Sequence, residues 1–85
     1  MNVNVEELIR QYVVTVTKAQ DIEVEIIEDT VVLSRADRWH IYVIPGRFTM
    51  IGCFVDEDID ISLVLRENAP EIINIYEMSK EDETV

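Results

Sequence analysis

The chain has few of the residues on which small proteins often depend for stability or chemistry. Its 85 residues include one cysteine, one histidine, one tryptophan, two glycines and two prolines. A single cysteine excludes a disulfide within the chain. Cys53 stands in an apolar run, where a thiol usually behaves as a small buried hydrophobe. Two isolated glycines cannot form a glycine-rich phosphate loop. The chain therefore has neither a disulfide framework nor a nucleotide-binding motif.

Long hydrophobic runs are also missing. No segment approaches the roughly 18 consecutive apolar residues of a membrane span. The N-terminal sequence MNVNVEELIR is acidic and lacks the basic start and apolar core of a signal peptide. We therefore expect a cytoplasmic protein that does not bind membranes.

Positive charge is scarce as well. Seven Lys and Arg residues stand against 18 Asp and Glu residues, which gives a formal net charge of −11. Proteins that bind nucleic acids carry basic patches that neutralise phosphates, so this chain would be repelled by DNA and RNA. A protein partner with a basic surface is expected instead. The alternative is that the charge serves only solubility.

Two segments have the signals of helices. Asn4 and Glu7 have the spacing of a capping box, and the apolar residues behind them recur with a helical period. This pattern predicts a helix over residues 5–19. The same capping spacing, followed by helically spaced apolar residues, predicts a short C-terminal helix over residues 69–78, with a sixth strand as the alternative.

Between these helices, alternation of apolar and polar residues predicts about five strands. Glu28 and Asp29 suit a turn after the first strand, and Pro45 followed by Gly46 is typical of a type II turn. The expected strands are 22–26, 30–34, 38–44, 47–55 and 59–66. The sum is an α+β fold: an N-terminal helix, an antiparallel meander of about five strands and a short C-terminal helix. We expect a single compact domain over residues 1–78 and a polar, frayed tail over residues 79–85.

The third and fourth expected strands are apolar on both faces. Trp39, Ile41 and Val43 alternate with Tyr42 and Ile44, and the next strand has the same character. Two short helices can cover only one face of such a sheet, and exposed apolar surface of that size usually marks an interface. A second copy of the chain is the simplest partner, so we expect a homodimer or a heteromeric complex.

Residues 54–67, FVDEDIDISLVLRE, come closest to a metal-binding motif. The oxygen-bearing residues that follow the ligand spacing of an EF-hand are Asp56, Asp58, Asp60, Ser62 and Glu67. The stretch resembles an EF-hand in this spacing, but its sixth position is Ile61, a β-branched residue where the loop needs glycine. We therefore expect no metal and no cofactor, and we interpret DEDID as a charged surface.

Catalytic motifs are missing too. His40 is the single histidine and stands beside Trp39 in an expected strand, without an evident partner for acid–base or ligand chemistry. The chain has no G-x-S-x-G and no pair of histidines at ligand spacing. We expect a protein that is not an enzyme.

Clustered carboxylates remain as the candidate binding groups. On a strand, carboxylates of residues i and i+2 lie roughly 6.8 Å apart on one face, and DNA carries a phosphate about every 3.4 Å on each strand. A row of carboxylates can therefore imitate a phosphate track. The predicted partner-binding residues are Glu23, Glu25, Glu28, Asp29, Asp56, Glu57, Asp58 and Asp60. Alternatively, Glu23 and Glu25 only protect an edge strand from pairing.

Two functional hypotheses follow. The first is an inhibitor that occupies a basic nucleic-acid-binding surface of a partner protein. In size and charge the chain is similar to phage proteins that disarm restriction or CRISPR nucleases, a likeness of composition without a shared motif. The alternative is a dimeric adaptor or secretion-chaperone-like module that binds a partner segment through an apolar sheet face. High salt should weaken the first kind of binding and not the second.

Overall fold

The computed structural model describes the backbone of residues 4–83 and the side chains of residues 4–80. The elements along the chain are α1 (Val5–Thr17), β1 (Ile22–Ile27), β2 (Thr30–Arg35), β3 (Trp39–Ile44), β4 (Arg47–Gly52), α2 (Asp56–Glu67) and α3 (Ala69–Glu83). The α+β class is confirmed, with four strands and three helices in the part of the chain that is described. None of these helices has both the length and the apolar character needed to cross a membrane.

The four strands form an antiparallel meander in the order β1-β2-β3-β4. Glu28 and Asp29 form the predicted first turn, and both have positive φ, 47° and 67°, as a tight type I′ hairpin requires. Pro45 and Gly46 form the third turn, in which Gly46 has φ 78°. Local turn chemistry therefore fixes the register of the meander.

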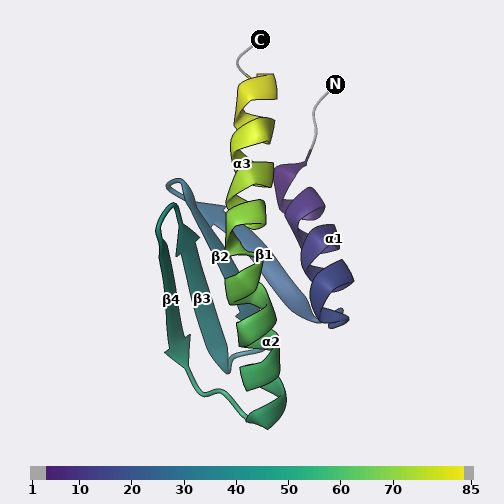
Figure 1. Ribbon diagram of the computed structural model, residues 1–85, viewed down its shortest axis with the longest axis vertical. Helices are drawn as coiled ribbons and strands as arrows, with labels where there is room; N and C mark the ends of the chain where they lie inside the picture. Colours follow the sequence, from purple (N-terminus) through teal and green to yellow (C-terminus); the bar gives the residue numbers. More distant parts are fainter. Residues whose placement is uncertain (1–3, 84–85) are drawn as a thin grey trace.

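All three helices lie on the same face of the sheet (Figure 1). Side chains of β3 that point toward the helices, Trp39, Ile41 and Val43, are completely buried. The helices contribute further buried residues to this core: Ile9, Val13, Ile61, Leu65, Ile72 and Ile73. The molecule is therefore a two-layer sandwich with a single core between sheet and helices.

The predicted fifth strand is wrong, because residues 59–66 belong to α2. The buried residues of α2 are Asp58, Ile61, Ser62 and Leu65, which recur at the helical spacing i, i+3, i+4 and i+7. The fourth strand is also shorter than predicted. Gly52 ends it with φ 124°, and a Cβ there would lie 2.3 Å from the carbonyl oxygen of Arg38.

The two predicted helices are confirmed with changed ends. α1 ends at Thr17, two residues before the predicted end, where Lys18 adopts a left-handed conformation with φ 63°. α3 begins at Ala69 as predicted and continues to Glu83. Helical backbone thus extends into the segment predicted as a tail, and residues 84–85 of that segment lie outside the described residues.

The two edges of the sheet differ. At the β1 edge, the Glu6 carboxylate of α1 accepts a hydrogen bond of 2.9 Å from the backbone N–H of Ile26. β4 forms the opposite edge and lies beside the helix layer rather than beneath it (Figure 1). Phe48 and Met50 of β4 consequently remain half-buried although they pack against the core.

Candidate protein-interaction surface

The face of the sheet opposite the helices is not covered by any described element (Figure 1). The strand register arranges its side chains in three rows across the sheet. The rows are Glu23, Ser34, His40 and Ile51; Glu25, Val32, Tyr42 and Thr49; and Ile27, Thr30, Ile44 and Arg47. We call these twelve residues the uncovered face.

The uncovered face has an apolar and aromatic middle. The rings of His40 and Tyr42 stack with 6.4 Å between their centroids. Val32, between Glu25 and Tyr42 in the middle row, is only 5% exposed, so the two rings provide more of the accessible surface there than it does. Ile27 and Ile51, at opposite corners, are 48% and 55% exposed. Exposed apolar and aromatic side chains of this kind are enriched at protein interfaces.

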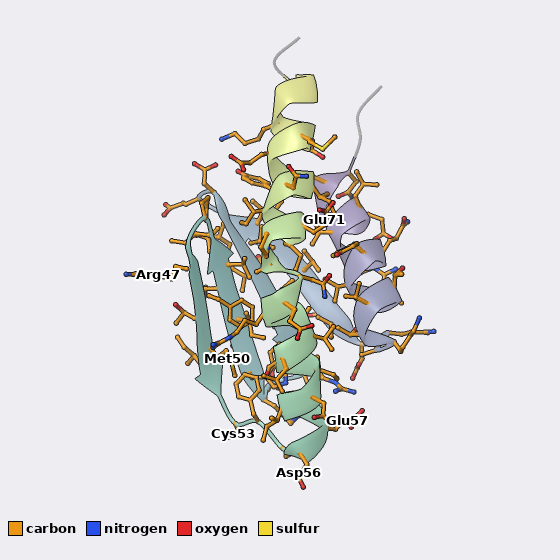
Figure 2. The ribbon with its side chains drawn as sticks, in the orientation of Figure 1. Arg47, Met50, Cys53, Asp56, Glu57 and Glu71 are labelled. Carbon is orange, nitrogen blue, oxygen red and sulfur yellow. The ribbon has the colours of Figure 1, made fainter. Side chains whose placement is uncertain are left out.

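Charge is distributed unevenly across this face. Glu23 and Glu25 are exposed on the edge strand β1 and form no ion pair among the described residues. Arg47 lies on the opposite edge strand, with its side chain directed away from the helices (Figure 2). The face is therefore acidic at its β1 side and basic at its β4 side.

The structure divides the eight predicted acidic contact residues among three places. Glu23 and Glu25 lie on the uncovered face. Glu28 and Asp29 form the β1–β2 turn at one end of the sheet. The other four, Asp56, Glu57, Asp58 and Asp60, lie at the start of α2, at the end of the molecule away from the chain termini (Figures 1 and 2). They do not form the single row that a continuous phosphate track would require.

Asp58 is placed differently from the other predicted residues, because it is fully buried. One carboxylate oxygen, Oδ1, accepts from Arg35 Nη1 at 3.1 Å and from Arg38 Nη2 at 2.9 Å. The other oxygen, Oδ2, accepts from Arg38 Nε and from the backbone N–H of Val55, each at 3.2 Å. The carboxylate therefore caps α2 and joins it to the β2–β3 hairpin, and it is not available to a partner.

Arg35 extends this buried network. Its Nε donates to Asp21 at 2.9 Å and its Nη2 to Glu57 at 3.3 Å. Burial alone would raise the pKa of Asp58. Hydrogen bonds from Arg38 and the Val55 amide outweigh burial, so this pKa lies below its usual value. The buried Trp39 indole N–H also lowers this pKa, although it lies outside the distance and angle limits of a hydrogen bond.

Asp29 also has a structural role. Its carboxylate accepts hydrogen bonds from the Tyr76 hydroxyl and from Lys80 Nζ, both on α3. The Tyr76 hydrogen bond, followed by Lys80, lowers the pKa of Asp29. These contacts fasten the β1–β2 turn to α3 while leaving Asp29 exposed. The sequence signals for Asp29 suggested a turn but not this anchoring role.

The structure also shows the conformation of the stretch that resembles a calcium loop and the exposure of Cys53. Residues 56–67 form a helix rather than a calcium loop, and the described chain contains no group of three His, Cys, Asp or Glu side chains that could hold an ion. Cys53 is exposed, contrary to the buried position expected from its apolar neighbours. It follows Gly52, where the chain leaves the sheet.

Comparison of the chain with protein-family models, with curated proteins and with solved structures found no match.

Proposed function

We propose that the chain is a non-enzymatic protein-binding module whose uncovered face contacts a partner with a basic surface. The observation that carries this proposal is the composition of that face, which combines an apolar and aromatic middle with Glu23 and Glu25 at its β1 side. In such interfaces the apolar centre contributes affinity, and charged groups at the rim direct association and select the partner.

A basic partner suits this face better than a second copy of the chain. Two copies would each carry a net charge of −11 and repel one another over the whole surface. A basic protein would instead be attracted before contact, and Glu23 and Glu25 would lie where it docks. A dimeric adaptor would instead depend on the apolar residues of the face alone.

A second candidate is an inhibitor that occupies a nucleic-acid-binding surface. It is favoured by the exposure of seven of the eight predicted acidic residues, all except Asp58. Because these carboxylates lie on one face and at both ends of the sheet, such a partner would have to contact more than one side of the molecule. The uncovered face needs no such enclosing partner and is the simpler proposal.

A pair of charge-reversal variants tests the proposed surface. Glu23→Lys/Glu25→Lys alters the uncovered face, and Glu67→Lys/Glu71→Lys alters exposed positions on the helix side. Each changes the net charge from −11 to −7 (−11 + 4), so nonspecific charge effects are matched. Each variant serves as bait in host lysate, and captured proteins are quantified by mass spectrometry. We expect the sheet variant to lose a partner that the wild type and the helix variant both retain.

Equal capture by both variants would contradict the role of the uncovered face. For a partner that the wild type captures, elution in a salt gradient separates the two candidate functions. A nucleic-acid enzyme that is released at modest salt would favour the inhibitor, whereas a partner retained at high salt would favour apolar binding by an adaptor. Circular dichroism of both variants confirms that the fold is intact.

A further inference from the structure

A groove of about 430 Å³ lies between the β3–β4 hairpin and the junction of α2 with α3. It is lined by residues 44–48 of the hairpin and by Arg66, Ala69, Pro70 and Ile73 of the helices. It opens at the β4 edge and on the helix side of the molecule. It shares Ile44 and Arg47 with the uncovered face, but its other wall belongs to the helices, so variants of that wall test it independently of the proposed function.

The fold explains why this groove exists and why it is apolar. β4 extends beyond the helix layer, so the Phe48 side chain is only half covered. The opposite wall is the start of α3, where Pro70 and Ile73 line the groove. The Tyr12 hydroxyl donates a 2.6 Å hydrogen bond to Asn68, which holds the α2–α3 junction in place. A preformed, mostly apolar groove of this volume is typical of small-molecule sites.

Arg66 gives the groove its polarity. Its guanidinium carbon lies 5.3 Å from the centre of the Phe48 ring, a cation–π arrangement that orients the guanidinium and leaves its N–H groups as donors. Arg66 forms no ion pair with any described residue, although the chain has 18 acidic residues. Arg47 also lines the groove, but its side chain points away from the helices (Figure 2).

We propose that this groove binds a small monocarboxylate with an apolar or aromatic body. The carboxylate pairs with the Arg66 guanidinium, which matches it in shape and charge. The apolar body lies against Phe48 and Ile73. A single negative charge fits better than a polyanion such as a nucleotide, because the net charge of −11 repels each additional charge on the ligand. The volume suits a small molecule rather than an extended peptide.

The test is an NMR titration of the ¹⁵N-labelled protein with octanoate and with 4-phenylbutyrate. We expect saturable shifts at residues 44–48 and 66–73 for at least one of them. The corresponding neutral amide should bind about tenfold more weakly, because it cannot form a charge-assisted bond. Arg66→Gln should weaken binding of the acid by about tenfold and remove the preference for acid over amide.

Lys18→Gln is the matched control. It also removes one positive charge, from an exposed lysine that forms no ion pair among the described residues and does not line the groove. It should leave the affinity unchanged. The proposal is overturned if neither acid gives saturable shifts, if the shifts map elsewhere, or if Arg66→Gln binds as well as the wild type. A peptide ending in a leucine carboxylate that binds more tightly than both acids would overturn the assignment to small molecules.

Discussion

At the scale of single residues, Asp58 is the buried acidic group of the described chain. Removing a carboxylate from water is costly, and here two guanidinium groups and a backbone N–H compensate for it. The arrangement is asymmetric, because Arg35 is largely buried whereas the Arg38 side chain is 40% exposed. Asp58 therefore depends on the hairpin that holds both arginines, and the hairpin depends on Asp58 for its attachment to α2.

We predict that Asp58→Asn lowers the free energy of unfolding by about 3 kcal/mol, the low end of the range for breaking a buried ion pair. The low end applies because Arg35 keeps its contacts with Asp21 and Glu57. Asp60→Asn is the control, since Asp60 is exposed and forms no ion pair among the described residues, and it should change stability by less than about 0.5 kcal/mol. Urea unfolding of both variants measures the difference. Equal stability of the two variants would contradict the structural role of Asp58.

The difference in stability between the wild type and Asp58→Asn should also depend on pH. Because the pKa of Asp58 in the folded protein lies below its ordinary value of 3.8, the unfolded chain takes up this proton first as the pH falls. The stabilisation by Asp58 is present at neutral pH and is lost as the pH drops below about 4, through the pKa of the folded state. The stability difference between wild type and Asp58→Asn should therefore shrink between pH 7 and pH 3. A constant difference would exclude this linkage.

At the scale of elements, α2 shows how an apolar pattern can be misleading. Ile59, Ile61, Leu63 and Leu65 recur at every second position, with Asp60, Ser62 and Arg66 among the residues between and after them, which predicted a strand. In the helix, Ile61 and Leu65 enter the core while Ile59 and Leu63 face solvent. Three acidic residues in the first turn and Arg66 in the last turn suit the helix dipole. That charge order was the sequence signal for a helix.

A pair of identical substitutions separates the helix from the strand. In a strand, Leu63 and Leu65 would share one face and cost similar amounts when truncated. In α2, Leu65 is fully buried and Leu63 is 56% exposed. We expect Leu65→Ala to cost about 3 kcal/mol and Leu63→Ala less than about 1 kcal/mol in urea unfolding. Similar losses for both would contradict the burial pattern of the helix.

Turns and helix caps could be predicted from sequence, whereas the long-range contacts could not. The turn at Pro45–Gly46 and the N-cap of α1 at Asn4 follow from local chemistry, and both are observed. The burial of Asp58 depends on its contacts with Arg35 and Arg38, which lie more than one element away in the chain. The groove depends on the position of the helix layer relative to β4, which no local pattern encodes. The fold class was therefore more accessible to prediction than the candidate site.

At the scale of the whole molecule, charge and the uncovered face act in opposite directions on self-association. The apolar middle of the face favours pairing with a second copy. The net charge of −11 on each copy opposes it, most strongly at low salt. Any self-association through this face would therefore depend on the balance between the two.

We predict that self-association through the uncovered face strengthens as salt rises from about 20 mM to about 500 mM, because the Debye length contracts several-fold. Light scattering coupled to size-exclusion chromatography measures the mass at each salt concentration. Tyr42→Glu should reduce the association, and Leu63→Glu on the helix side is the control for added charge. A dimer that weakens with salt, or that responds equally to both variants, would place the contact elsewhere.

The hydrogen bond from the Ile26 backbone N–H to Glu6 also limits how copies of the molecule can assemble through their sheet edges. Contact between the β1 edge of one copy and the β4 edge of the next would repeat without end and produce a filament. Glu6 occupies a donor at the β1 edge, whereas β4 has no such cover among the described side chains. If strands were added at an edge, they would add at β4, where two copies related by a two-fold axis would exhaust one another's free edge. An assembly formed in this way closes at two chains.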